Sequence, residues 1–267
     1  VAYTLALLGE RPLLCAAVGA EDFAGYGRQL EEAGVDVSTV LPCDDVGTAT
    51  AFITTDGGGN QITAFFPGAM SRAGAIDLTV LDGVSEVVAG ADASAAMAAH
   101  CEQAGQMGAR LLFAPAQQIP ALSDDQLRRG LELAWCVVGN DYELRMIEER
   151  TGVGVARLRQ RCLVAVTLGE RGSELHSPDG VVAIPAAAVS RVADPTGAGD
   201  AYIAGLLRGL RRDDPLEVAG RMGAVAAAFC VEHPGPQAHS FTTAEFEARY
   251  TAAFGSALPR RLESPHE

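Results

Sequence analysis

The sequence predicts an α/β fold built on a mostly parallel sheet, with a small β lid. Short apolar runs alternate along the chain with segments of helical periodicity, which is typical of parallel strands joined by helices. Near the front, two β-prone runs flank a glycine-rich turn, which predicts a hairpin projecting from that body. The chain has 267 residues, 48% of them hydrophobic, enough to bury one large core. We therefore expect a single domain over 1–267, with the hairpin at about 48–67 as its lid.

The first expected element is a helix over 1–9. This stretch is apolar and has no capping residue before it, so we expect that an N-terminal segment is missing before Val1. A strand over 13–18 and a helix over 22–33 follow.

The expected hairpin consists of two runs, 48–55 and Gln61–Phe66. Between them, residues 56–60 read Asp-Gly-Gly-Gly-Asn, a composition that favours a tight turn. A hairpin that projects from an α/β body can close over a site and exclude water.

The middle of the chain alternates short apolar runs with amphipathic segments. The expected strands are Glu86–Ala89, 110–114, 135–139 and 163–168, and the expected helices are 93–107, 123–133 and 141–150.

A second hairpin is expected at 173–176 and 181–184, because Pro-Asp-Gly separates the two runs. Two long helices should follow, at 199–211 and Leu216–Val231. The second is crowded with Ala and Gly, which permits a close approach between this helix and a sheet.

Composition narrows the function classes. The formal net charge is −14 and all 20 basic residues are Arg, which disfavours nucleic acid as a partner. No apolar run reaches the roughly 18 residues of a membrane span, and no signal peptide is visible, so we expect a cytoplasmic protein. The six cysteines are widely spaced and the five histidines lack metal-ligand spacing, which predicts buried thiols and no structural metal.

One motif carries chemistry without reference to any family. In Asp194-Pro195-Thr196-Gly197-Ala198-Gly199-Asp200, a Gly-x-Gly turn runs into an apolar helix. Backbone amides of such a turn and of the helix N-terminus can surround one anion. Asp200 in the first turn would then stand beside that anion and could accept a proton from an attacking hydroxyl. The alternative is that Asp200 is only an acidic first-turn residue favoured by the helix dipole.

The whole string matches the second signature of the ribokinase-like (PfkB) family of sugar and nucleoside kinases, D-[PT]-x-G-A-G-D before a small-residue apolar helix. The resemblance implies a ribokinase-like three-layer α/β/α fold and ATP-dependent phosphoryl transfer. It implies that Asp200 is the catalytic base, and that Gly197, Ala198 and Gly199 form the anion hole for the γ-phosphate.

Three further segments resemble family motifs, and the first two have a plainer alternative. Asn140 and Glu143 match an N-x-x-E motif that orients Mg²⁺ through water, or they cap a helix. The segment 167–172 resembles a T-x-G-x-x-G nucleotide motif, or it is only the entrance to a hairpin. The loop 232–237 resembles the one that closes over the adenine of ATP and, with Asp194 and Thr196, holds a monovalent cation such as K⁺. The resemblance thus assigns ATP contacts to Asn140, Thr167, Gly169, Gly172 and Gly235.

The acceptor is suggested by a resemblance to the bacterial adenosine-kinase-like branch, carried by residues 65–70 and 114–118. Phe52 and Phe65, at facing ends of the hairpin, could stack on a purine, and Gln117 and Gln118 could read its edge. Alternatively, these aromatics fill the hairpin-to-body interface and the glutamines cap a strand.

We therefore predict a kinase that phosphorylates the hydroxymethyl group of a nucleoside, with adenosine as the acceptor, using ATP and Mg²⁺. A sugar kinase is the first alternative. The second is a catalytically impaired nucleotide-binding protein or fragment, because the acceptor-binding Asp and the G-G-x-x-x-N segment that family members carry are absent from the sequence. In relatives the lid also joins dimers, and Phe52 or Phe66 could serve that purpose here.

Overall fold

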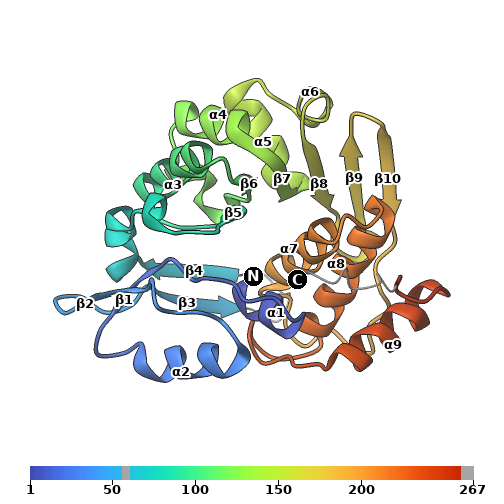
Figure 1. Cartoon of the computed structure of the whole chain (residues 1–267), viewed down its shortest axis with the longest axis horizontal. Helices are drawn as coiled ribbons and strands as arrows, with labels where there is room; N and C mark the ends of the chain where they lie inside the picture. Colours follow the sequence, from blue (N-terminus) through green and yellow to red (C-terminus); the bar gives the residue numbers. More distant parts are fainter. Residues whose placement is uncertain (56–60, 260–267) are drawn as a thin grey trace. The chain divides into compact units, whose positions relative to one another are not determined.

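The structure, a computed structural model, describes residues 1–55 and 61–259. The chain divides into two compact units. The first unit comprises Val1–Pro12, Val138–Arg145 and Val155–Glu267, and the second comprises Leu13–Val137 and Met146–Gly154. Figure 1 labels the elements of both.

The central sheet has six strands in the order β10-β9-β8-β7-β6-β5. In the second unit, β5 (Glu86–Ala89), β6 (Arg110–Phe113) and β7 (Ala134–Asn140) pair in parallel. Strand β8 (Leu163–Thr167) follows β7 in this order and pairs antiparallel with β9 (Ser173–Ser177), with Thr167 opposite Ser173. Strands β9 and β10 (Gly180–Ile184) form an antiparallel hairpin. The predicted mostly parallel α/β fold is confirmed.

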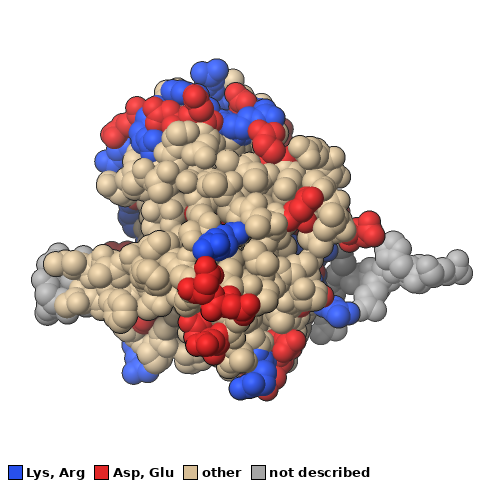
Figure 2. Space-filling model, turned by 90° about the vertical axis from the view of Figure 1, so that its left-hand side faces the viewer, with Lys and Arg blue, Asp and Glu red and all other residues tan. Residues whose placement is uncertain are grey.

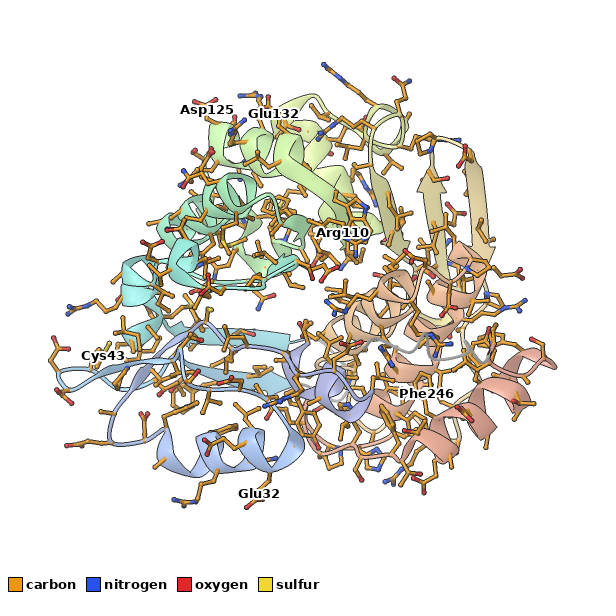
Figure 3. All side chains as sticks on the ribbon, viewed as in Figure 1. Glu32, Cys43, Arg110, Asp125, Glu132 and Phe246 are labelled. Atoms are coloured by element: carbon orange, nitrogen blue, oxygen red, sulfur yellow. The ribbon has the colours of Figure 1, made fainter. Side chains whose placement is uncertain are left out.

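Helices of the second unit pack on its parallel strands. Helix α3 (Ser94–Met107) contacts β5 and β6, and α4 (Asp124–Leu133) contacts β6. Helix α4 begins where the sequence predicts it, because Ser123 and Gln126 form a reciprocal capping box. At the strand edge, the guanidinium of Arg110 lies 4.3 Å from the centroid of the Trp135 ring and pairs with Glu86 (Figure 3).

The first unit is built on two helices, α7 (Ala198–Arg211) and α8 (Leu216–Val231), which pack against each other. Gly205 has no room for a Cβ, because that atom would lie 2.4 Å from the carbonyl oxygen of Met222. On the other side of α8, a Cβ at Gly220 would lie 2.7 Å from Ile184 of β10. The close approach between helix and sheet predicted for α8 is confirmed.

Three more helices complete this region. Helix α1 (Ala2–Leu7) contacts α7, α9 (Thr243–Phe254) contacts α8, and α5 (Asp141–Thr151) follows β7 and belongs partly to each unit. In α9, the Phe246 ring packs 5.2 Å from that of Phe241 (Figure 3).

The strand predicted at 13–18 is wrong in extent, and the observed strand lies outside the central sheet. Strand β1 covers only Ala17–Gly19, and it pairs in parallel with β2 (Leu41–Cys43) in a separate two-stranded sheet. Leu13 makes only an isolated bridge to Asp36. The apolar character of this run is explained by packing, since Ala17 is buried against Ala73 and Ala96 rather than in the central sheet.

The predicted hairpin is present as β3 (Thr50–Thr55) and β4 (Gln61–Phe66), paired antiparallel, with α2 (Ala24–Ala33) preceding them in the chain, and its role as a lid stays a prediction. The predicted turn at 56–60 lies outside the described residues. The structure also contains elements that the sequence analysis did not predict: η1 (Gly68–Ala75), η2 (Leu78–Val80), η3 (Ala116–Ala121), α6 (Val155–Leu158) and η4 (Gly169–Arg171), besides β2 and α9.

Surface charge is mixed. Acidic and basic side chains intermingle near the top of the face seen in Figure 2, at the height at which α4 lies in Figure 1. Within α4, Arg129 pairs with Glu132, and it also pairs with Glu102 of α3. None of the six cysteines, all within the described residues, is in a disulfide, and four of them are buried. Over residues 1–55 and 61–259, no helix combines the length and apolar character needed to cross a membrane.

Candidate active site

The loop before α7 is held by Asp194. Its Oδ1 accepts the backbone N–H of Thr196 at 2.8 Å, and its Oδ2 accepts that of Gly235 at 3.0 Å. The Thr196 hydrogen bonds, helped by the Gly235 bond, hold the pKa of Asp194 below its ordinary value. Asp194 therefore joins the segment that leads into α7 to the loop that follows α8, 41 residues later.

Gly197 stands at the cap of α7 with φ +84°, a left-handed conformation that glycine adopts without strain. A Cβ at this position would lie 2.6 Å from Cβ of Pro236 and 3.4 Å from Sγ of Cys230. Both its conformation and its surroundings therefore require glycine here.

Cys230, at the end of α8, is a member of this site that sequence reasoning missed. Its thiol donates to the carbonyl oxygen of Thr196 at 3.6 Å, a long contact typical of sulfur. Burial, with the nearby charges of Asp200 and Asp194, raises the pKa of the thiol to about 11. The group stays protonated at neutral pH and can keep donating. Only its position in an apolar run was visible in the sequence.

Asp200 is exposed in the first turn of α7, two residues after Ala198. The N–H of Ala198 donates to the carbonyl of Pro195 at 3.2 Å and so helps to form the turn. Amides in the first turn of a helix have no carbonyl one turn earlier to bond, and they carry partial positive charge. A Cβ at Gly199 would meet no atom within 4 Å, so a ligand can approach the backbone there closely. The Asp200 carboxylate thus lies in the first turn of α7, directly after the glycine turn, while its role as a base and the anion-binding role of the amides stay predictions.

Asn140 and Glu143 hold each other in a reciprocal capping arrangement at the start of α5. The Asn140 side chain accepts the Glu143 N–H at 2.8 Å, and Oε2 of Glu143 accepts the Asn140 N–H at 2.9 Å. The alternative interpretation as a helix cap is therefore correct as far as it goes. It fixes the carboxylate at the end of β7 and leaves its second oxygen, Oε1, outside the cap.

The segment 167–172 forms a turn between β8 and β9. The N–H of Leu168 donates to the carbonyl of Gly172 at 2.8 Å, and Gly169 takes φ +61°. Gly172 (φ +89°) could not carry a Cβ, which would lie 2.0 Å from the carbonyl oxygen of Ile184. The need for glycine at 172 thus comes from the neighbouring backbone, whereas a Cβ at Gly169 would meet open space.

Glu232 and Arg249 link the segment before the Asp194 motif to the end of α8. The Arg249 guanidinium donates to both Glu232 oxygens, at 2.7 and 3.0 Å, and lies 4.5 Å from the Phe229 ring centroid. Glu232 also accepts the N–H of Ser190 at 2.7 Å. Its bonds with Arg249 and Ser190 lower the pKa of Glu232 to about 2. The segment before the motif and the end of α8 are therefore bound to α9.

In the second unit, the hairpin register separates the two predicted stacking residues. Phe52 is opposite Ala64, and Phe65 is opposite Ala51. Directly opposed residues share a face and neighbours along a strand alternate, so Phe52 and Phe65 lie on opposite faces. The expectation that both stack on one base is wrong for this register.

Each face of the hairpin is apolar. One carries Phe52, Ile62 and Phe66, which are 68%, 79% and 52% exposed. The other carries Ile53 and Phe65, which are 45% and 49% exposed. Only one of these faces can contact a given small ligand.

Gln117 and Gln118 lie in η3, directly after β6 and Ala114. Gln117 is exposed and Gln118 is half-buried. Ala116, just before them, has φ +45°, which is uncommon for a residue other than glycine and is found most often at functional sites.

The donor set for a metal is sparse. Within the part of the chain that the structure describes, no group of three or more His, Cys, Asp and Glu side chains could hold an ion. A cation at this site would therefore depend on oxygen atoms of a ligand, on backbone carbonyls and on water.

Comparisons with known proteins agree with the family that the motifs resemble. The model of the family described as pfkB family carbohydrate kinase matches residues 1–244. A nucleoside kinase of Methanothermobacter thermautotrophicus is 35% identical over 261 residues, covering 94% of this chain and 82% of that protein. An ATP-dependent ribose-1-phosphate kinase of Halopiger xanaduensis is 30% identical over 234 residues, covering 85% of this chain and 78% of that protein.

Among solved structures, the Burkholderia thailandensis nucleoside kinase in complex with inosine matches with a TM-score of 0.93 at 35% identity. That match covers 96% of this chain and 85% of the other. The complex of the same protein with ADP-inosine gives the same TM-score and identity.

Proposed function

Because this chain belongs to the pfkB family of carbohydrate kinases, we propose that it transfers the γ-phosphoryl group of ATP to the hydroxymethyl group of a nucleoside. The observation that carries the proposal is the exposed carboxylate of Asp200 beside the first amides of α7. The names of the similar proteins support the nucleoside, because two of them are nucleoside kinases.

Asp200 is proposed as the base. Its carboxylate accepts the proton of the acceptor hydroxyl as that oxygen bonds to the γ-phosphorus and the bond to the β-phosphate oxygen breaks. Gly197, Ala198 and Gly199 form the turn whose amides, with those of the first helical turn, face the charge on the transferred group. Fixed donors of this kind need no reorganisation during the reaction. Asp194 and the Cys230 thiol keep the turn in place through the hydrogen bonds to Thr196 and Gly235.

Two cations are part of the proposal. Glu143 and Asn140 fit a water-mediated Mg²⁺, since their cap fixes the carboxylate and such an ion keeps several waters. When bound, Mg²⁺ would neutralise charge on the ATP phosphates. Asp194 and Thr196 are proposed to lie at a K⁺ site, because the Asp194 carboxylate joins the segment before α7 to the loop after α8 through its bonds to Thr196 and Gly235.

We propose a purine nucleoside as the acceptor, adenosine first and inosine as its nearest competitor. The less exposed hairpin face, with Phe65 and Ile53, would stack on the base, and Gln117 and Gln118 would read its edge. The Thr167, Gly169, Gly172 and Gly235 turns are proposed to contact ATP. A sugar or sugar phosphate is the second candidate, favoured by the similarity to the ribose-1-phosphate kinase.

The test of the acceptor is ADP release measured over a panel of nucleosides, sugars and sugar phosphates with ATP and Mg²⁺. We expect the highest kcat/KM with a purine nucleoside. A sugar preferred over all nucleosides would overturn the acceptor. No ADP release with any acceptor, despite ATP binding, would favour a nucleotide-binding protein instead.

The test of the base is Asp200→Asn. We expect turnover to fall by at least about a thousandfold while ATP affinity stays near that of the parent protein. Asp125→Asn is the control, because Asp125 is also an exposed acid in the first turn of a helix, where it pairs with Arg128. Retained turnover in Asp200→Asn would refute the assignment.

The hairpin face with Phe52, Ile62 and Phe66 is proposed to bind a second copy of the chain. Three exposed apolar side chains on one face form a patch that association would remove from water. Phe52→Ser should shift the species observed in sedimentation toward the monomer. An unchanged sedimentation profile across concentration would exclude this face as the contact.

A further inference from the structure

The base of the hairpin is attached to the rest of the second unit by one carboxylate that neither the motif nor the proposed function uses. Oδ2 of Asp22 accepts the backbone N–H of Thr48 at 2.9 Å, and Oδ1 accepts the Thr48 hydroxyl. The same hydroxyl accepts the backbone N–H of Gly19 at 2.8 Å. Thr48, shortly before β3, is therefore bound both to the end of β1, at Gly19, and to Asp22 in the segment before α2.

The other end of the hairpin meets the same place. Strand β4 ends at Phe66, and three residues later the N–H of Ala69 donates to the carbonyl of Gly47 at 2.9 Å. Gly68 has φ +47°, and a Cβ there would lie 2.3 Å from the Gly47 carbonyl oxygen. Both ends of the hairpin thus converge on residues 47 and 48.

The space around Asp22 is closely filled. A Cβ at Gly19 would lie 2.7 Å from the Thr48 nitrogen and 2.8 Å from Oδ1 of Asp22, and one at Gly47 would lie 3.1 Å from Oδ2. The carboxylate therefore sits against backbone on two sides, although Asp22 itself is exposed. Its hydrogen bonds with Thr48 hold its pKa below the ordinary value, so it is charged at neutral pH.

We propose that Asp22, acting through Thr48, is a positioning residue that fixes the orientation of the hairpin and so the placement of the apolar face that receives the acceptor. A charged acceptor bonded to both donors of one residue defines its orientation more firmly than one neutral bond. Because Thr48 precedes β3 and its neighbour Gly47 binds Ala69 after β4, Asp22 holds the place where both strands of the hairpin begin or end. The consequence for the acceptor rests on the proposed function, whereas the consequence for hairpin order does not.

The experiment compares Thr48→Val with Thr48→Ser. Valine matches threonine in shape and removes the hydroxyl, whereas serine keeps it. Hydrogen exchange of peptides covering 50–55 and 61–66 should be about tenfold faster in Thr48→Val and unchanged in Thr48→Ser. Affinity for adenosine or inosine, measured by calorimetry, should fall about tenfold in Thr48→Val, with the affinity for ATP unchanged.

Thr79→Val is the matched control. Asp77 accepts both the N–H and the hydroxyl of Thr79, at 2.9 and 2.7 Å, at an exposed site in η2. It should leave hairpin exchange unchanged. Asp22→Asn is the second variant: it removes the charge and replaces one of the two acceptor oxygens by an N–H donor, so it should also speed hairpin exchange.

The results separate the two proposals. Faster exchange confined to the hairpin supports the positioning role even if no nucleoside binds, in which case only the proposed acceptor fails. Unchanged hairpin exchange in both Thr48→Val and Asp22→Asn would overturn the inference. An equal rise of exchange over the whole chain would also overturn it, because it would show a general loss of stability.

Discussion

At the residue scale, Gly199 is a position where stability does not require glycine but the proposed anion binding does. Its Cβ would enter open space in the first turn of a helix, where alanine is favoured over glycine by roughly 0.5–1 kcal/mol. We expect Gly199→Ala to be at least as stable as the parent protein by urea unfolding. Turnover should nevertheless fall at least about tenfold, because the methyl group would occupy the approach to the anion-binding amides.

Gly197→Ala serves as the contrast. It should lose stability, since its backbone is left-handed and its Cβ would meet Pro236. Equal turnover of Gly199→Ala and the parent protein would contradict the predicted anion hole.

Glu143 allows the cap and the Mg²⁺ role to be told apart. Glu143→Gln keeps an oxygen for the Asn140 N–H, so α5 should remain capped and the melting temperature should change little. If the carboxylate orients hydrated Mg²⁺, the Mg²⁺ concentration for half-maximal activity should rise about tenfold. The measurement is a Mg²⁺ titration of ADP release at saturating ATP. An unchanged titration would leave only the capping role.

The local structure around single residues was predictable where neighbouring residues determine it. The positions of Asp200 and of the glycines before it were predicted correctly, because Gly-x-Gly before an apolar run is a recognisable turn and helix start. The division of Phe52 from Phe65 was not predictable, because a shift of one residue in hairpin register moves every side chain to the other face. The contacts of Asp194 with Gly235 and of Cys230 with Thr196 join distant parts of the chain, and no local sequence pattern predicts them.

At the scale of elements, the pairing of Glu232 with Arg249 predicts how α9 and the loop at Ser190 respond to acid. The pKa of Glu232 is held at about 2, below the ordinary value of a glutamate, so its contribution to stability is present at neutral pH. That contribution is lost as the pH falls from about 4.5 to about 2, because the unfolded chain takes up the proton first.

Glu232→Gln should therefore lose about 2 kcal/mol of unfolding free energy at pH 7 and much less near pH 2. Urea unfolding at several pH values measures this. Glu217→Gln is the control, because Glu217 pairs with Arg221 one turn along α8 and is 54% exposed, so its loss should stay below about 0.5 kcal/mol. Equal losses in the two variants would contradict the proposed difference.

Element prediction succeeded where periodicity and caps agree. Helix α4 and the parallel strands β5 to β7 have such signals. Helix α9 was missed although Thr242 and Glu245 form a capping box, a T-x-x-E pattern that could have located it. Strand β1 was misplaced because an apolar run says that a segment is buried, not which sheet it joins.

At the scale of the whole molecule, His239 should make stability depend on pH. It is fully buried, its Nε2 lies 3.1 Å from the hydroxyl oxygen of Thr4, and burial lowers its pKa to about 4. The folded protein thus keeps this histidine neutral while an unfolded chain would protonate it near 6.5. Stability is complete above about pH 6.5 and is lost as the pH falls toward 4.

The loss attributable to this one group is about 3 kcal/mol between pH 7 and pH 4. Urea unfolding of His239→Gln should show a correspondingly shallower pH dependence in that range, whatever its stability at pH 8. Parallel curves for the variant and the parent protein would show that His239 does not titrate as expected.

The helix pair α7 and α8 has a consequence for how the acceptor range could change over generations. Gly205 and Gly220 admit no further carbon, so random substitution there would be eliminated whatever the acceptor. The exposed hairpin side chains face no such restriction. A population under selection for a new acceptor could therefore vary the hairpin, which is proposed to contact the acceptor, while α7 with its proposed base and α8 stay unchanged.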